Sequence, residues 1–151
     1  MENYTIRTAN YQDAITLISF QKKMAWDTEG LLLDEDVLSK GVEALLKDES
    51  KGTYYVAEYI GEIVGCLLTT AEWSEWRNGT VLWIQSVYVK ENFRNKGVFK
   101  KLYNFIKEKV ESDNNLMGIR LYVDKSNISA QEVYNKIGMN GQHYQLFEWL
   151  K

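Results

Sequence analysis

The residues with the clearest chemical character form a turn, Arg94-Asn95-Lys96-Gly97-Val98-Phe99, between a β-rich run and an amphipathic one. The first amides of a helix have no intrahelical partner and carry the positive end of its dipole, so a phosphate is a natural occupant of the turn. Gly97 would let a phosphate oxygen approach the backbone closely. Positive charge surrounds the spot, at Arg94, Lys96, Lys100 and Lys101. These residues also suit an ordinary solvated helix start, so the turn alone leaves both interpretations open.

A second set of spaced residues, Asn127, Ala130, Tyr134, Gly138 and Met139, follows the next β-rich run. Four-residue spacing puts Ala130, Tyr134 and Gly138 on nearly one face of a helix. Each residue also has a purely structural interpretation, because Asn127 can cap the helix, Tyr134 can be a half-buried aromatic and Gly138 can end the helix. The chemical interpretation depends on the two stretches acting together.

Together the two stretches resemble the acetyl-CoA-binding core of the GNAT superfamily of N-acetyltransferases. The first motif of that family is Arg or Gln, two residues, Gly, one residue, then Gly or Ala; the chain matches it at Arg94 and Gly97 and departs from it at Phe99. The later motif, Asn-x-x-Ala-x-x-x-Tyr-x-x-x-Gly-Phe/Met, is matched in full from Asn127 to Met139. The resemblance extends over essentially the whole chain and implies an α/β (α+β) GNAT fold.

The resemblance implies a role for each matched position. Backbone groups of a splayed strand would pair with the pantetheine arm of acetyl-CoA, the amides of residues 95–99 would hold the pyrophosphate, and Asn127 would bond the pantetheine side. The implied cofactor-binding residues are Val87, Tyr88, Val89, Arg94, Asn95, Lys96, Gly97, Val98, Phe99, Asn127 and Ala130. Tyr134 would act as the general acid that protonates the departing thiolate, since a phenol is protonated at neutral pH. The ring of Phe99 must then point away from the phosphates or narrow their site.

The general base, which must take a proton from the amine acceptor, is less clearly indicated by the sequence. An amine acceptor must lose a proton to attack, and many relatives use a glutamate on the fourth strand for this. Here Trp83 and Gln85 occupy the corresponding stretch; neither is a base, although Gln85 can position a water or the acceptor. The carboxylates elsewhere are Asp27, Glu29, Glu72 and Glu75, of which we predict Glu29 as the base. A proton relay through His143 and a chain of waters remain alternatives.

Four tryptophans, Trp26, Trp73, Trp76 and Trp83, fall in the stretches assigned to the acceptor side. They are either core and interface packing or the wall of a pocket that holds a cation against its ring faces. The implied function is an acetyl-CoA-dependent N-acetyltransferase that transfers the acetyl group directly to a primary amine of a small molecule or peptide. The rival is a non-catalytic acyl-CoA-binding sensor or interaction module, which Phe99 and the missing strand-four carboxylate favour. A homodimer is compatible with either of these functions.

Hydrophobic periodicity predicts the elements that position these residues. Strands are expected at 4–7, 53–60, 63–72, 80–89, 117–123 and 142–149. Asn10 is expected to cap a helix that runs to about Trp26 and buries Tyr11, Ala14, Ile15 and Ile18, before a loop at 27–33. Further helices are expected from Asp34, with Leu38, Val42, Leu45 and Leu46 inward, at 96–111 and at 130–137. The order β-α-α-β-β-β-α-β-α-β predicts a mixed, mostly antiparallel sheet with helices on both faces.

The bulk composition narrows the class of protein. A chain of 151 residues with no linker-like stretch predicts one domain over residues 1–151. A net charge of −3 disfavours a nucleic-acid surface. No apolar run approaches the roughly 20 residues of a membrane span, and no signal peptide is evident, so a cytoplasmic protein without membrane contact is expected. We predict no metal, and we expect the lone cysteine, Cys66, to be inert packing.

Overall fold

The computed structural model describes residues 3–151, and contacts divide the chain into two compact units, Met1–Arg120 and Leu121–Lys151. The first unit holds one five-stranded sheet in the order β1-β2-β3-β4-β5. All neighbouring strands are antiparallel except β4 and β5, which are parallel. The strands are β1 (Thr5–Thr8), β2 (Thr53–Tyr59), β3 (Glu62–Ser74), β4 (Gly79–Val89) and β5 (Leu116–Arg120). The predicted mixed, mostly antiparallel sheet is confirmed.

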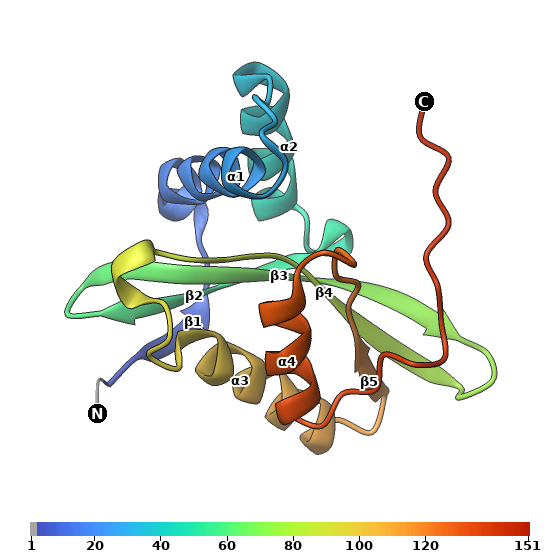
Figure 1. Cartoon of the computed structure of the whole chain (residues 1–151). Coiled ribbons are helices and arrows are strands. Elements are labelled where there is room, and N and C mark those ends of the chain that lie inside the picture. The colour runs from blue at the N-terminus through green and yellow to red at the C-terminus, as the bar shows by residue number, and fades with distance from the viewer. Residues whose placement is uncertain (1–2) are drawn as a thin grey trace. The chain divides into compact units, whose positions relative to one another are not determined.

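Three α-helices belong to this unit: α1 (Ala14–Glu29), α2 (Glu35–Lys47) and α3 (Val98–Ser112). Helices α1 and α2 cover one face of the sheet and α3 covers the other, as Figure 1 shows. Leu17, Phe20 and Val42 of the first pair pack with alternate strand residues, among them Val56 and Cys66. Val98, Leu102 and Ile106 of α3 are buried too. Two apolar layers therefore enclose the sheet.

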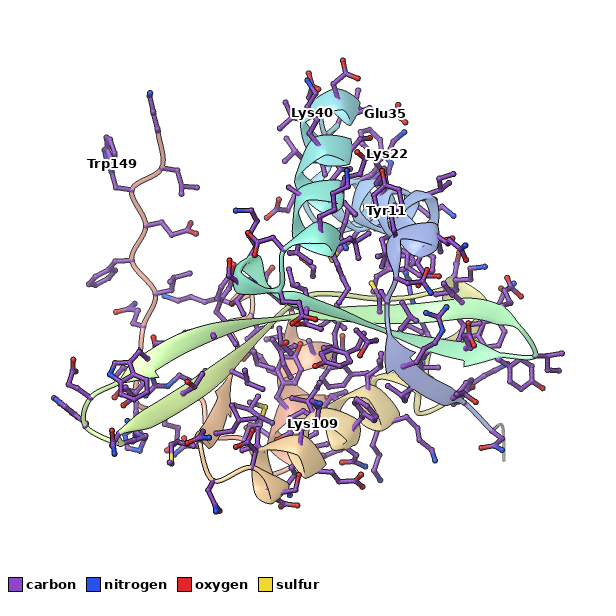
Figure 2. All side chains as sticks on the ribbon, turned by 180° about the vertical axis from the view of Figure 1, so that it is seen from behind. Tyr11, Lys22, Glu35, Lys40, Lys109 and Trp149 are labelled. Carbon is purple, nitrogen blue, oxygen red and sulfur yellow. The ribbon has the colours of Figure 1, made fainter. Side chains whose placement is uncertain are left out.

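The contact between α1 and α2 also includes a polar pair at its rim. Lys22 Nζ lies 3.4 Å from Glu35 Oε2, and Figure 2 shows the two side chains pointing toward each other. Asp34 caps α2 by accepting a hydrogen bond from Val37 N at 3.0 Å, as its position before the apolar stripe predicts. Partly buried Leu38, Leu45 and Leu46 pack against the core beside Val42. The predicted inward stripe of α2 is therefore confirmed.

The predicted inward stripe of the first helix is confirmed at Ala14 and Ile18 and wrong at Tyr11 and Ile15. Tyr11 is 50% exposed and Ile15 is 83% exposed, while Leu17 and Phe20 are buried. Residues 14–20 contain two overlapping apolar stripes, and the one that meets the sheet is decided by how α1 packs, not by the period itself. Tyr11 in fact lies in a short 3₁₀ turn, Tyr11–Asp13, which Asn10 caps.

Helix α1 is also longer than predicted. Asp27 and Glu29, expected in a loop, form its last turn, and the helix ends at Gly30, which adopts a left-handed φ of 60°. Nothing between Trp26 and Glu29 breaks a helix, and Thr28 Oγ1 donates back to Met24 O at 2.7 Å. Left-handed glycine is the usual helix stop, so the boundary moves to Gly30.

A partly buried ion-pair network links β1 to Asp13 and to β2. Arg7 donates to Asp13 at 2.7 and 3.0 Å and to Glu58 at 2.8 and 3.0 Å. These hydrogen bonds lower the pKa of Asp13 below its ordinary value of 3.8, opposed by the desolvation of the carboxyl. A depressed folded-state pKa means that the stabilisation is present above about pH 4 and is lost as the pH falls through the lower folded value.

Replacement of Asp13 with asparagine is therefore expected to lower the free energy of unfolding at pH 7 by about 2 kcal/mol, because the partly buried guanidinium of Arg7 loses a charged partner. The difference from the parent chain should shrink as the pH falls below 4. Urea unfolding at pH 7 and at pH 3 measures both. Asp36→Asn, on exposed α2 surface, serves as the control; equal loss in the two variants would contradict the role of the Arg7 network.

The second unit contains one helix, α4 (Ile128–Lys136), after which Gly138 takes a left-handed φ of 93°. The predicted stop at Gly138 is therefore confirmed. The predicted strand at 142–149 is wrong: among the described residues the structure assigns no strand after α4, and the segment runs as the extended trace in Figure 1. The predicted strand at 117–123 likewise stops at Arg120. A strand needs a partner for its backbone, and apolar sequence alone does not supply one.

Candidate active site

Within the described residues of the first unit, the second half of β4 has no strand beside it on the side of β5. Its pairing with β5 covers only residues from Thr80 to Trp83, although β4 continues to Val89. A bulge against β3 falls at Ser86, whose φ is 53°. Lys90 N bonds to Val64 O on β3 at 2.8 Å, so alternate residues such as Val89 turn their backbone groups to the opposite edge. The chain thus presents backbone groups that an extended ligand can pair with.

The predicted anion turn follows this edge directly. After the short 3₁₀ turn Glu91–Phe93, Asn95 and Gly97 take left-handed φ values of 62° and 81°. Helix α3 starts at Val98, two residues later than predicted, and no side chain caps it. At this start Lys101 N donates a hydrogen bond to Gly97 O at 3.0 Å. Left-handed residues at two alternate positions give such a turn the backbone form of a concave anion cradle.

The close approach of α3 to the sheet depends on a residue that the sequence did not single out. A Cβ added at Gly65 on β3 would lie 2.9 Å from Val98 Cγ1 and 3.1 Å from Tyr88 O. Real Cβ atoms do not approach so closely, so only glycine lets the first turn of α3 sit on β3. Gly65 thereby sets the position of the anion turn relative to the open edge of β4. Its one signal in the sequence was a glycine inside a strand pattern, which marks a close backbone approach.

Arg94 anchors the turn through its side chain. Its Nε donates to Val89 O at 2.9 Å, its guanidinium lies 5.6 Å from the centroid of Tyr88, and Nη2 lies 3.8 Å from Asp27 Oδ2. Because Asp27 belongs to the last turn of α1, Arg94 links that helix to the end of β4. The carbonyl of Val89 is thus occupied by Arg94, while the backbone of Val87 is not involved in this contact.

The departure from the family motif at Phe99 is accommodated within α3. The Phe99 ring lies 6.1 Å from that of Tyr103, one helical turn further on, at an interplanar angle of 35°. The ring is half-buried along the helix. Lys96 lies with its Nζ 5.5 Å from the centroid of Phe93. These contacts run along the helix and the preceding turn, so the bulky residue at Phe99 is compatible with the backbone cradle.

A cavity of about 530 Å³ adjoins the turn. Its lining comes from α1, through Lys23 and Asp27, from Glu62 and Tyr88, and from residues 90–94. Two opposed charge pairs lie in this wall, Lys90 with Glu62 and Arg94 with Asp27. The cavity therefore extends the turn toward α1 and offers both signs of charge.

In the second unit, the residues of the later motif form a capped helix start. Asn127 Oδ1 accepts from Ala130 N at 3.1 Å, so Asn127 caps α4, and Ala130 lies in its first turn. Tyr134 is half-buried one turn further, and desolvation raises its pKa above the ordinary value of 10. A phenol with a raised pKa holds its proton throughout the neutral range. Tyr134 is therefore suited to donate a proton and unsuited to accept one.

The candidate carboxylates occupy different surroundings. Glu29 is exposed at the end of α1, whereas Glu72 on β3 pairs with Arg120 at 2.5 Å. Gln85 Nε2 donates to Thr70 Oγ1 at 3.3 Å, on the same face of β3 as Glu72. Arg120 was not among the residues predicted from the sequence, and its signal, a cation at the end of an apolar run, was weak. Glu72 and Arg120 lie along the half of β4 that pairs with β5, and Gln85 lies just beyond that half.

The four tryptophans do not form one wall. Asp27, next to Trp26, contacts Arg94 beyond the C-terminal end of β4, whereas Trp73 and Trp76 lie around the turn that enters β4 at its other end. A strand of 11 residues separates these ends by roughly 35 Å. Trp26, Trp73 and Trp76 are each more than 60% exposed, so they are not core either. The single aromatic pocket is thus not formed by this set.

Two further predictions concern the lone cysteine and the lone histidine. Cys66 is fully buried, and desolvation raises the pKa of its thiol to about 12. A thiol so disfavoured as a thiolate is not a nucleophile at neutral pH, which confirms it as packing. His143 lies in the exposed segment after α4, not on a strand.

Among residues 3–151, no group of three or more His, Cys, Asp or Glu side chains is arranged to hold a metal ion, and no helix is long and apolar enough to cross a membrane.

Comparison with known protein families identifies the family to which the chain belongs. The model of the acetyltransferase (GNAT) family matches residues 12–139. The chain belongs to the GNAT acetyltransferase family. A possible acetyltransferase from Clostridium difficile 630 is 45% identical, with 99% of each chain covered and a TM-score of 0.91. No curated protein sequence matches the chain.

More distant structures share the fold. A ribosomal-protein-alanine N-acetyltransferase from Brucella melitensis biovar Abortus 2308 is 16% identical, with a TM-score of 0.80 and coverage of 99% of this chain and 100% of the other. The aminoglycoside N-acetyltransferase AAC(6')-Iy, solved in complex with CoA, is also 16% identical, with a TM-score of 0.79 and coverage of 100% and 97%. Their acceptors differ, so the fold itself does not select one.

Proposed function

We propose that this protein is an acetyl-CoA-dependent N-acetyltransferase that transfers the acetyl group directly to a primary amine of a small molecule or peptide. The observation that carries the proposal is the continuous run from the open edge of β4 through the uncapped turn at residues 94–97 into α3. An unpaired strand edge suits the amide-bearing pantetheine arm, and the turn suits the pyrophosphate that follows it. Membership of the acetyltransferase family supports the same assignment.

In this proposal Val87, Tyr88 and Val89 line the pantetheine arm, and the amides from Asn95 to Phe99 hold the pyrophosphate. Arg94 orients the turn through the carbonyl of Val89. Asn127 and Ala130 bind from the side of α4, and Tyr134 protonates the departing thiolate. The raised pKa of Tyr134 supports this role, because the acid must be protonated when the thioester breaks. We propose that these residues act within one domain over residues 1–151.

Acetyl transfer to the amine requires two proton transfers. The neutral amine attacks the thioester carbonyl, and collapse of the tetrahedral intermediate breaks the carbon–sulfur bond. The thiolate takes its proton from Tyr134, and the ammonium nitrogen of the tetrahedral intermediate gives one to a base, which leaves a neutral amide. We propose Glu29 as that base and Gln85 as a group that positions the acceptor. Asp27 and Glu72 already face Arg94 and Arg120, which supports the choice of Glu29.

The proposal is tested by thiol release from acetyl-CoA across a panel of primary amines, together with acetyl-CoA binding by calorimetry. Turnover with at least one amine is expected, with the acetyl group recovered on nitrogen. Tight binding of acetyl-CoA without turnover on any amine would instead favour the non-catalytic acyl-CoA-binding module. The panel should span polyamines, aminoglycosides, amino acids and peptide N-termini.

Removal of the proposed base gives a narrower prediction. Glu29→Gln is expected to lower kcat/KM at pH 7 about tenfold, with a smaller deficit at high pH where the amine is already neutral. Glu72→Gln is the matched comparison, because it removes a carboxylate that is bound to Arg120. A pH–rate profile of both variants measures the effect. Loss confined to Glu72→Gln would move the assignment of the base to Glu72.

A further inference from the structure

The bulge in β4 contains a backbone conformation that is unfavourable for the residue that adopts it. Where the register between β3 and β4 shifts, two residues of β4, Ser86 and Val87, lie opposite the single residue Leu67 of β3. When the first residue of a bulge is left-handed, it is usually glycine. Here it is Ser86, with a φ of 53°. A residue with a Cβ keeps this conformation only where its surroundings hold it there, so the contacts of Ser86 decide the shape of the strand.

Tyr54 on β2 makes the first of these contacts. Its phenol hydrogen-bonds with the side chain of Ser86. The register brings the two together, because Tyr54 lies opposite Leu68 on β3 and Leu68 lies opposite Gln85, the neighbour of Ser86. Tyr54 is 4% exposed, and its desolvation raises the pKa of the phenol well above the ordinary value of 10. The hydroxyl therefore stays protonated throughout the neutral range, as a lasting hydrogen-bond partner of Ser86.

Cys66 on β3 makes the second contact. Its Sγ donates a weak hydrogen bond to Ser86 O at 3.6 Å and accepts one from the backbone N–H of Tyr88. One thiol thus bonds to the backbone on both sides of Val87. Tyr54, Cys66 and Tyr88 belong to one buried cluster on the face of the sheet that α1 covers in Figure 1. The thiol is inert as a nucleophile, yet it bridges the bulge.

We propose that Tyr54 and Cys66 are positioning residues, which hold the bulge at Ser86 in the form that binds the pantetheine arm of acetyl-CoA. The bulge turns the backbone of β4 directly before Val87–Val89, to which the proposed function assigns that arm. Without these contacts Ser86 would relax toward ordinary extended backbone, and the backbone groups that follow would change direction. The inference rests on the proposed function and adds two residues that act on the cofactor through the backbone of β4.

Tyr54→Phe tests the first contact, because it removes the hydroxyl and keeps the ring. The acetyl-CoA dissociation constant is expected to rise about 10-fold, as for one lost hydrogen bond, whereas kcat at saturating acetyl-CoA should stay within about twofold of the parent value. In the free chain, the amides of residues 86–88 should exchange with solvent about 10-fold faster, while those of Leu102 and Ile106 in α3 keep the parent rate. Calorimetry, steady-state kinetics and NMR-detected hydrogen exchange measure these effects.

Tyr55→Phe is the matched control. Tyr55 is the neighbour of Tyr54 on β2, is 6% exposed and hydrogen-bonds through its phenol to Thr69. Its ring packs on the opposite face of the sheet, 5.6 Å from that of Phe105 in α3. The variant therefore loses a buried hydrogen bond of the same kind, away from the bulge, and should bind acetyl-CoA like the parent chain. Equal loss of affinity in the two variants would overturn the proposal in favour of general destabilisation.

Ser86→Gly provides a rescue that a merely destabilised variant would not show. Glycine adopts left-handed backbone without the steric cost of a Cβ, so a bulge with glycine at this position no longer needs the hydroxyl of Tyr54. The double variant Tyr54→Phe/Ser86→Gly is expected to recover acetyl-CoA affinity to within about threefold of the parent value. Failure to recover would overturn the role of Tyr54 in holding Ser86.

Two variants of Cys66 test the second contact. Cys66→Ala removes both hydrogen bonds and is expected to weaken acetyl-CoA binding about 10-fold, whereas Cys66→Ser keeps a donor and an acceptor and should lose less than about threefold. Equal affinity in these two variants would overturn the bridging role of the thiol. A parent chain that does not bind acetyl-CoA would overturn the proposed function instead. Exchange at residues 86–88 of the free chain involves no cofactor, so parent-like rates in Tyr54→Phe would overturn the inference about the bulge alone.

Discussion

Replacement of Gly97 with glutamate is expected to weaken acetyl-CoA binding at least 100-fold. Gly97 has a φ of 81°, a left-handed conformation that residues with a Cβ adopt at a cost of about 1–3 kcal/mol. The new carboxylate also stands at the turn where the proposal places the pyrophosphate, so like charges repel in the complex. Because no atom lies within 4 Å of an added Cβ at this position, the variant should still fold. Calorimetric titration with acetyl-CoA measures the loss, and the melting temperature checks the fold.

Gly61→Glu provides a matched control for this variant. Gly61 has a φ of 77° and equally open space around an added Cβ, but it lies in the turn between β2 and β3. The backbone strain and the added charge are therefore the same, and acetyl-CoA affinity should stay within about twofold of the parent value. Gly97→Asn, which tolerates left-handed backbone without adding charge, should keep much of the affinity. Parent-like affinity in Gly97→Glu would overturn the assignment of the turn as the pyrophosphate site.

The second large effect is expected from Tyr134→Phe, which should lower kcat about 100-fold while the acetyl-CoA dissociation constant changes less than twofold. The substitution keeps the ring and removes only the hydroxyl, so packing is preserved and the leaving thiolate loses its proton donor. General acid catalysis typically contributes this much or more. Single-turnover rates of thiol release, measured beside calorimetric affinity, separate chemistry from binding.

The pH dependence supplies an independent check on Tyr134. Because desolvation raises the pKa of Tyr134 above its ordinary value of 10, ionisation of this phenol should cause no marked fall in rate between pH 7 and pH 9. Tyr122→Phe, a tyrosine of the same unit that is 55% exposed, is the control and should retain the parent rate. Equal turnover in Tyr134→Phe and the parent chain would exclude Tyr134 as a required acid. Equal loss of acetyl-CoA affinity and of kcat would assign it a binding role instead.

Local signals in the sequence were sufficient where the structure depends on a residue and its near neighbours. The Asp34 cap and the glycine stop at Gly138 both occur as predicted, because each depends on conformational preferences within a few residues. The anion turn belongs to the same class, since Gly97 signals its left-handed backbone through its own identity. The family motifs follow from such local requirements.

Other features required contacts between distant segments. Two apolar stripes were available on α1, and the face that is buried was settled by packing on the sheet, which exposes Ile15 and buries Leu17. Likewise the 142–149 segment has the composition of a strand, but its state depends on a partner for its backbone. The position of α3 depends on Gly65 and Val98, which are 33 residues apart in the numbering and adjacent in the fold.

The sequence by itself determined the family, the element order as far as α4 and the turn at Arg94–Phe99, because these depend on residue identity and short-range spacing. Only the tertiary structure decided that β4 parts from β5 after Trp83, that Arg94 caps the carbonyl of Val89, and that Phe99 packs along its own helix toward Tyr103. Strand divergence and side-chain direction arise from register and packing between elements, and neither is encoded in a local stretch of sequence.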